Sequence, residues 1–147
     1  MTDLSTCLYQ AGYQAVAIEL TETQHFTVRA IINKKEALFV VDCGASHSCL
    51  DRKVAEEMGL HLNDSLDKAS GLGSNTMDKS ETLIEQFRIE MCYFDNVSFA
   101  VLDLTNINEA LQVCGQSPID GIIGNDILLK SNAVIDFKRA LLYIKQP

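Results

Sequence analysis

One short stretch constrains this chain more than any other: an apolar run, Leu38–Val41, that ends directly in Asp42-Cys43-Gly44-Ala45-Ser46. Successive apolar side chains indicate a strand that is buried on both faces and therefore central in its sheet. A carboxylate placed immediately after such a strand is costly unless it is hydrogen-bonded or used in chemistry. The simpler alternative is a structural aspartate that caps a turn. Asp42 is therefore the first candidate for a functional carboxylate.

The rest of the chain has mostly the pattern of short strands with turn residues between them. We expect strands at Ala15–Leu20, Phe26–Ile32, Leu38–Val41, Leu83–Ile89, Val97–Leu104, Ile119–Gly124, Val134–Phe137 and Leu141–Ile144. The predicted hairpin turns are Asn33–Glu36, Asp95-Asn96 and Lys138-Arg139. This pattern predicts a mainly β fold, compatible with a small closed barrel.

Two or three short helices are expected beside the strands. One spans Asp3–Ala11 and ends at Gly12, and a second spans Asp51–Met58, with Asp51 as its N-cap and Gly59 after its end. Asn106 and Glu109 have the spacing of a capping box that opens a helix through Val113. A single helical turn is predicted at Asn125–Lys130.

Size and composition fit one domain over residues 1–147, with a hydrophobic fraction of 47% that can form a core. The net charge of −8 argues against a nucleic-acid partner, because phosphate binding needs clustered Lys and Arg. Five cysteines without CxxC spacing favour neither a disulfide framework nor a zinc ribbon. The start of the chain has no signal-peptide pattern, and no apolar stretch is long enough for a membrane helix. We therefore expect a cytoplasmic protein without a membrane partner.

Two segments together carry a family resemblance. The first is Phe39–Ser46, and the second is Ile119–Asp126, which runs on into Ala133–Phe137. They resemble the retropepsin-like aspartic peptidases, the retroviral-type enzymes and their single-domain bacterial relatives. In that family an apolar strand delivers Asp-Thr/Ser-Gly-Ala, and a later apolar-apolar-Gly strand passes behind the catalytic loop. The resemblance covers roughly residues 26–145 as the core and leaves residues 1–25 as an N-terminal extension with a strand.

The resemblance implies an acid-protease barrel that works as a homodimer and hydrolyses peptide bonds in a peptide or protein substrate. No cofactor and no metal are implied. The implied catalytic residue is Asp42. The residues implied to surround it are the active-site loop Cys43, Gly44, Ala45 and Ser46, the substrate-covering flap Ser70, Gly71, Leu72, Gly73 and Ser74, and the loop-supporting strand Ile122, Ile123 and Gly124.

Elementary chemistry supports the paired arrangement. Peptide hydrolysis by water needs a base for the water and an acid for the carbonyl oxygen or the leaving nitrogen. Two carboxylates about 3 Å apart share one proton and supply both functions, and aspartic proteases are the standard example. This chain offers one suitable loop, because Asp120-Gly121-Ile122 lacks the preceding apolar run and the small residue after glycine. The second carboxylate is therefore expected from a two-fold copy.

Cys43 departs from the family pattern, which has Thr or Ser at that position. A thiol is a weaker hydrogen-bonding group than a hydroxyl. The alternative function is therefore a dimerising or peptide-binding domain with the same barrel and weak or no activity. Other interpretations of this stretch are a cysteine nucleophile or a metal site from Cys43, His47 and Cys49, but the spacing lacks a second ligand pair. We expect His47 to be an ordinary loop residue.

Overall fold

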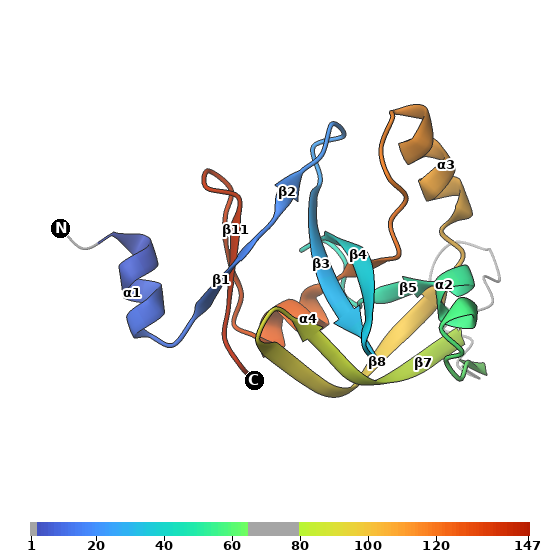
Figure 1. Ribbon diagram of the computed structural model, residues 1–147, viewed down its shortest axis with the longest axis horizontal. Coiled ribbons are helices and arrows are strands. Elements are labelled where there is room, and N and C mark those ends of the chain that lie inside the picture. Colours follow the sequence, from blue (N-terminus) through green and yellow to red (C-terminus); the bar gives the residue numbers. More distant parts are fainter. Residues whose placement is uncertain (1–2, 65–79) are drawn as a thin grey trace.

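A computed structural model describes residues 3–64 and 80–147 of the chain. Six of its strands close into a barrel in the order β3-β4-β9-β5-β8-β7, and β7 pairs back with β3 (Figure 1). Short strands β2 and β6 extend the sheet beyond the barrel. The bounds of these eight strands are β2 Glu19–Leu20, β3 Phe26–Ile32, β4 Lys35–Val41, β5 Cys49–Asp51, β6 Asn63–Asp64, β7 Ser80–Ile89, β8 Cys92–Leu102 and β9 Gly121–Ile123. The predicted mainly β closed barrel is confirmed.

The strand before Asp42 lies in the middle of the sheet, as predicted. β4 pairs antiparallel with β3 on one side and parallel with β9 on the other. In the parallel pair, Val41 lies opposite Ile123, so both strands end at the same level. β5 completes this region by pairing antiparallel with β9 and parallel with β8.

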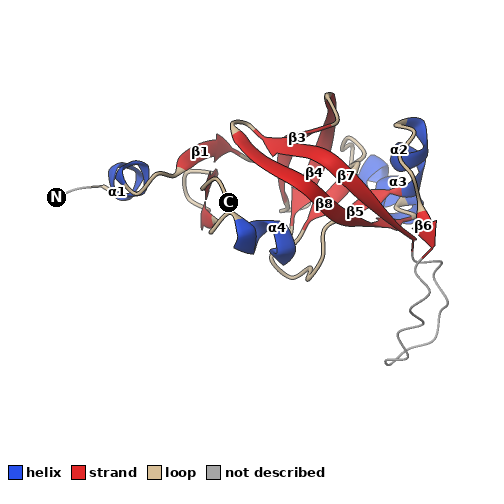
Figure 2. Ribbon diagram, turned by 90° about the horizontal axis from the view of Figure 1, so that it is seen from below, coloured by secondary structure: helices blue, strands red, loops and turns tan. Residues whose placement is uncertain are grey.

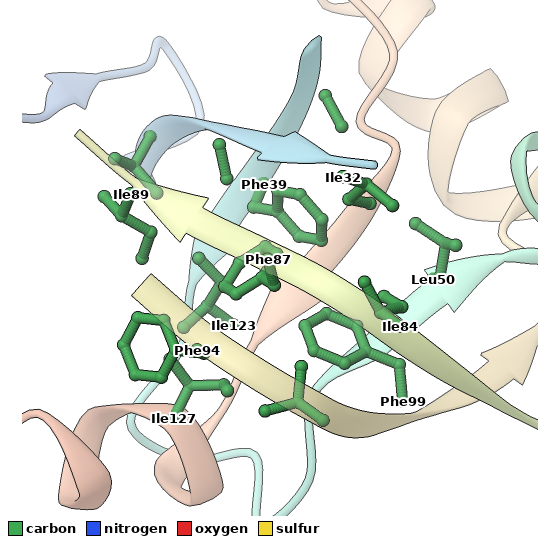
Figure 3. Packing of buried hydrophobic residues seen from close by; sticks show 14 of the residues in the cluster. Ile32, Phe39, Leu50, Ile84, Phe87, Ile89, Phe94, Phe99, Ile123 and Ile127 are labelled. Carbon is green, nitrogen blue, oxygen red and sulfur yellow. The ribbon is translucent and has the colours of Figure 1, made fainter. Parts of the chain in front are cut away.

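The barrel interior is filled by aromatic and branched aliphatic side chains (Figure 3). The ring centroid of Phe87 lies 5.1 Å from that of Phe99 and 5.7 Å from that of Phe39. Each of these three rings is no more than 1% exposed, and burying such a side chain contributes about 1.5–3 kcal/mol. Because side chains fill the interior, polar chemistry in this fold belongs on the barrel's rim and outer surface.

A second, three-stranded antiparallel sheet lies beside the barrel, with strand order β1-β11-β10 (Figures 1 and 2). Its strands are β1 Gln14–Ala17, β10 Val134–Asp136 and β11 Leu141–Ile144. It therefore joins the beginning of the chain to its end. The predicted strand Ala15–Leu20 is divided, because β1 pairs in this sheet while β2 pairs with the barrel strand β3.

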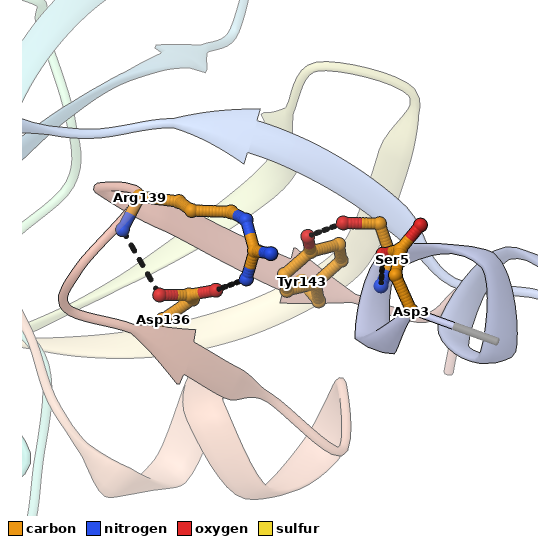
Figure 4. A network of polar contacts seen from close by, with 5 residues as sticks. All are labelled: Asp3, Ser5, Asp136, Arg139 and Tyr143. Carbon is orange, nitrogen blue, oxygen red and sulfur yellow. Dashed lines mark hydrogen bonds and ion pairs between the residues drawn. The ribbon is translucent and has the colours of Figure 1, made fainter. Parts of the chain in front are cut away.

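Helix α1 (Leu4–Gln10) contacts this small sheet through Tyr143 (Figure 4). The Ser5 hydroxyl lies 2.6 Å from the hydroxyl of Tyr143, and the Tyr9 ring meets the Tyr143 ring edge-on at 6.3 Å between centroids. Nearby, the hydrogen bond from Arg139 lowers the pKa of the Asp136 carboxyl, whose side chain is 8% exposed. No residue of α1 is buried, so tertiary packing contributes little to this helix.

The described residues contain three more short helices: α2 Arg52–Glu57, α3 Thr105–Val113 and α4 Asn125–Lys130, the last being the predicted helical turn. Gly59 follows α2 with φ of +69°, as expected for a residue that ends a helix. None of the helices in the described ranges is long and apolar enough to cross a membrane.

Asp51 occupies the N-cap position of α2, as predicted, but its side chain makes no capping hydrogen bond. Its carboxylate accepts a hydrogen bond from the backbone N–H of Leu104 at 3.0 Å instead. Two local predictions were wrong. The capping box at Asn106 is absent, because α3 begins at Thr105 and the Thr105 N–H binds the Asp103 carboxylate instead. The predicted turn Asp95-Asn96 lies inside β8, and the chain reverses at Glu90-Met91.

Burial divides the five thiols into two groups, and this division yields the first prediction. Cys7, Cys43 and Cys114 are exposed, whereas Cys49 and Cys92 are buried. Burial raises the pKa of Cys49, and it raises the pKa of Cys92 to about 11. At pH 8 about 0.1% of a thiol with that pKa is the reactive thiolate. We expect iodoacetamide to label Cys7 and Cys114 of the folded protein rapidly, and Cys49 and Cys92 only after denaturation, as measured by peptide mass spectrometry. Rapid labelling of Cys92 in the folded chain would contradict the packing described above.

Candidate active site

Asp42 lies directly after β4, at the rim of the barrel, and is exposed in the single chain. Its carboxylate oxygen Oδ1 accepts a hydrogen bond of 2.8 Å from the backbone N–H of Gly44. The Ala45 N–H donates to the Asp42 carbonyl at 3.1 Å, which closes the turn. A turn-capping aspartate makes the same contact with the second residue after it, so this bond does not distinguish a structural from a catalytic role. The contacts that the rest of the chain makes with this loop are therefore needed to distinguish the two roles.

The last residue of β9 and the residues after it hold this loop through three hydrogen bonds. The Asp42 N–H donates to the Ile123 carbonyl at 3.0 Å, and the Asn125 N–H donates to the Ala45 carbonyl at 2.8 Å. The Asn125 side-chain amide donates to the Cys43 carbonyl at 2.9 Å. These bonds fix the backbone on both sides of Gly44 while the Asp42 carboxylate stays at the surface.

Gly124 is required at its position by close packing against the loop. A Cβ atom there would lie 2.8 Å from the Ala45 carbonyl oxygen and 2.8 Å from the His47 carbonyl carbon. Both are backbone atoms, so no side-chain rotation would relieve the contact. Gly44 faces a related limit, since a Cβ would lie 3.1 Å from the Asp42 Oδ1 atom.

A buried serine and an aspartate connect the end of the loop to α4. The Ser48 hydroxyl, in a residue with 0% exposure, donates to Asp126 Oδ1 at 2.6 Å and accepts from the Gly124 N–H at 2.9 Å. The Ser48 N–H donates to both carboxylate oxygens of Asp126 at 3.0 Å. Asp126 is therefore occupied in supporting the loop, and this cluster brings together residues 78 positions apart.

The other residues singled out from the sequence are placed as follows. Ile122, Ile123 and Gly124 lie behind the loop, with Ile123 buried in the core and Ile122 in a smaller apolar cluster outside the barrel. Cys43 and Ser46 are exposed on the loop, and the Ser46 hydroxyl lies 2.9 Å from Nδ1 of the exposed His47. The predicted flap Ser70, Gly71, Leu72, Gly73 and Ser74 lies outside the described residues.

The alternative interpretations of the loop find no support in this geometry. Cys49 is buried in β5 whereas Cys43 and His47 are exposed. Across residues 3–64 and 80–147, no three His, Cys, Asp or Glu side chains are grouped so that they could hold a metal ion. Asp120 directly precedes β9, and its carboxylate accepts a hydrogen bond from the Leu38 N–H at 2.7 Å. Leu38 lies four residues before Asp42 on β4, which is about 13 Å at ~3.3 Å per residue.

Sequence reasoning missed the supporting residues Ser48 and Asn125, and it assigned Asp126 only to a helix or turn. Asn125 and Asp126 directly follow the recognised Ile-Ile-Gly stretch, which is a usable local signal. Nothing near Ser48 in the sequence indicates its partner. As a chemical arrangement, the loop presents one exposed carboxylate on a rigid support, while the nearby Asp126 is already hydrogen-bonded.

Replacing Ser48 tests this support. In Ser48→Ala the buried Gly124 N–H loses its acceptor and Asp126 loses a donor, and an unsatisfied buried group costs about 1–3 kcal/mol. We expect the free energy of unfolding, measured by urea denaturation, to fall by that amount. Ser46→Ala is the matched control in the same loop, and as an exposed position it should change stability by less than about 0.5 kcal/mol. Equal effects of the two substitutions would show that the Ser48 contacts do not stabilise the loop.

Comparisons with known proteins agree with the family that the sequence motifs resemble. A family model described as aspartyl protease matches residues 28–127, and a search of curated proteins gave no match. Among solved structures, a retropepsin-like aspartic protease from Rickettsia conorii is similar over 91% of this chain and 92% of its own, with 20% identity and a TM-score of 0.64.

Two further structures resemble the chain. The retroviral protease-like domain of Ddi1 from Leishmania major covers 80% of this chain and 86% of its own, with 23% identity and a TM-score of 0.52. The EIAV protease, solved with the inhibitor HBY-793, covers 81% and 99%, with 16% identity and a TM-score of 0.54. These structural similarities concern the fold. The residues matched by the family model include both Asp42 and the segment that supports it. The chain belongs to the aspartyl protease family and has a retropepsin-like fold.

Proposed function

We propose that this chain is an aspartic endopeptidase whose active form is a homodimer, with one Asp42 from each copy. The observation that carries the proposal is the exposed Asp42 carboxylate on a loop held by Ile123, Gly124 and Asn125. A rigidly supported backbone around an unburied acid is what a positioned catalytic group needs. A purely structural aspartate would have no need of this external support.

In the proposed reaction, two Asp42 carboxylates share one proton. The ionised carboxylate removes a proton from a water molecule, whose oxygen attacks the peptide carbonyl carbon, while the protonated carboxylate donates its proton to the carbonyl oxygen. A tetrahedral diol results. When the diol collapses, the C–N bond breaks and one hydroxyl proton passes to the ionised carboxylate. The other carboxyl donates the proton that it took from water to the leaving nitrogen, so the pair again holds one proton. No covalent intermediate with the protein forms.

Two other acids in the described part of the chain support the need for a second copy. Asp126 is occupied by Ser48, and Asp120 by the Leu38 N–H. Both carboxylates are therefore engaged in hydrogen bonds that hold the fold together. Asp120 also binds β4 at Leu38, several residues before Asp42. A two-fold axis beside the loop would place an identical carboxylate opposite Asp42 without any further residue.

Asp42→Asn tests the catalytic assignment. The amide keeps the shape of the side chain but cannot accept a proton from water, so we expect the rate of cleavage of a denatured protein at acid pH to fall by about 10²–10⁴. Thermal unfolding should change little because the side chain is exposed. Cleavage is measured by gel electrophoresis and by the appearance of new N-termini, with and without a transition-state-analogue inhibitor of aspartic proteases.

Mixing the two chains separates a half-enzyme from a complete one. An excess of Asp42→Asn chains should inhibit the wild type by forming hybrid dimers, and specific activity should fall on dilution as dimers dissociate. Val113→Ala chains, changed at an exposed position of α3, should not inhibit when they are mixed in the same excess. Activity that stays proportional to chain concentration, in a species of monomer size, would contradict the homodimer.

Cys43 is where the family pattern changes, and its exposed position places it on the loop that would meet the partner. A net neutral hydrogen bond contributes about 0.5–1.5 kcal/mol even with good donors, so the weaker thiol should loosen the dimer without preventing catalysis. We expect Cys43→Thr to tighten dimerisation, measured by sedimentation, and to leave activity equal or higher.

The opposite outcome has a distinct signature. If Cys43→Thr abolishes activity, the loop does not use this position as the family does, and a peptide-binding role without catalysis is favoured. A covalent dimer on non-reducing electrophoresis that depends on Cys43 and regains activity on reduction would instead make Cys43 a redox control. Cys43→Ser is the control for that measurement.

A further inference from the structure

The start of β8 is bound by a side chain from the C-terminal segment. Strands β7 and β8 form a hairpin that reverses at Glu90-Met91, and the end of β11 lies beside this turn (Figure 1). The Tyr93 N–H donates to Oε1 of Gln146 at 2.9 Å, and Nε2 of Gln146 donates to the Tyr93 carbonyl at 2.7 Å. One side-chain amide thus makes the same two bonds with Tyr93 that a paired residue of a neighbouring antiparallel strand would make.

Neighbouring contacts fix Gln146 in this position. The Lys145 N–H donates to the Ser131 carbonyl at 2.9 Å, and the Lys145 carbonyl accepts from the Cys92 thiol at 3.5 Å. From the small sheet, Oε1 of Gln14 accepts from the Met91 N–H at 3.2 Å. The backbone before Gln146 is therefore attached to the core of the fold, and its side chain can reach Tyr93 without ordering a long free tail.

The backbone groups that Gln146 binds belong to the edge of β8 that faces away from β7. Tyr93 lies opposite Arg88 of β7 in the strand register, but its N–H and carbonyl both bind Gln146. On this second edge the neighbouring strand is β5, which pairs with β8 only from Ala100 onward. In the described part of the chain, no strand pairs with this edge between Tyr93 and Ala100. Gln146 therefore covers one end of an open strand edge.

The composition of β8 makes an open edge unfavourable. Strand Cys92–Leu102 has one charged residue, Asp95, and contains neither Pro nor Gly. Beside the turn, Met91 is 69% and Tyr93 46% exposed. Strands with high β-propensity, little charge and no Pro readily pair with other chains, and edge strands are commonly protected by Lys or Pro. Because β8 has neither residue, its protection must come from another part of the chain.

We propose that Gln146 is an edge cap, which by occupying the N–H and carbonyl of Tyr93 prevents β8 from pairing with the same edge of a second copy. Such pairing would compete with the two-fold association that brings two Asp42 residues together. The cap takes no part in catalysis, so the inference holds whether or not the chain cleaves peptides.

The test compares the wild type with Gln146→Ala and with Gln112→Ala, a matched control at an exposed glutamine of α3. In Gln146→Ala we expect the Tyr93 amide to exchange with deuterium roughly 2- to 13-fold faster by NMR, as for the loss of one hydrogen bond. On prolonged incubation at high concentration, this variant should form species larger than a dimer that bind thioflavin T, measured by sedimentation and fluorescence. Gln112→Ala should match the wild type in both measurements.

A second substitution distinguishes edge pairing from general loss of stability. Tyr93→Lys, added to Gln146→Ala, places a positive charge at the open edge and should abolish the larger species, with circular dichroism confirming a folded chain. If Gln146→Ala does not fold, Gln146→Met, which keeps the side-chain length without the amide, replaces it in both experiments.

Three results would overturn the inference. The first is an unchanged Tyr93 exchange rate in Gln146→Ala, which would show that the amide does not protect this edge. The second is faster exchange without larger species, because the open edge would then not pair with other chains. The third is larger species that persist in the double variant, since these would form through a different surface.

Discussion

The parallel pairing of β4 with β9 is the constraint on which the candidate site depends. Because parallel strands end at the same edge of a sheet, Val41 and Ile123 finish side by side and Asp42 emerges next to Gly124. The pairing tolerates no side chain at Gly121, where a Cβ would lie 2.5 Å from the ring of Phe39. Phe39 belongs to the aromatic core, so core packing, strand pairing and the position of the loop are parts of one arrangement.

Local patterns in the sequence predicted the strands well but located one chain reversal wrongly. The predicted turn Asn33–Glu36 lies at the right place but is shorter than expected, because β4 begins at Lys35. Asn33 and Lys34 both have positive φ and form the two-residue turn between β3 and β4. Asn96 also has positive φ, at +53°, yet β8 continues through it. The residue type correctly indicated unusual backbone but not a reversal, because the flanking apolar positions keep facing the core. The true turn has no Gly, Pro, Asn or Asp, so only pairing within the barrel specifies it.

The residues of the candidate site differ in the same way: some belong to contiguous motifs, and others are specified by contacts between distant parts of the sequence. The Asp42 loop and the Ile122–Gly124 stretch are contiguous motifs, and the sequence alone singled them out. Ser48 with Asp126 joins positions far apart, and Asp51 binds the Leu104 N–H rather than its own helix. From the sequence alone, a carboxylate directly before a helix is expected to cap that helix. Whether it caps depends on a partner that only the folded chain provides.

Within one chain the barrel closes, its aromatic core is buried, and the Asp42 loop is held by its own hydrogen bonds. Folding of the described part therefore does not require a second copy to complete its core. Under the proposed function, association supplies a second carboxylate rather than missing structure. Folding and activity are then separate equilibria, and a chain can be fully folded yet inactive below the concentration at which it pairs. Under the same proposal, Cys43 lies on the loop that would meet the partner, so a thiol in place of a hydroxyl there should act on the second equilibrium rather than on the stability of the barrel.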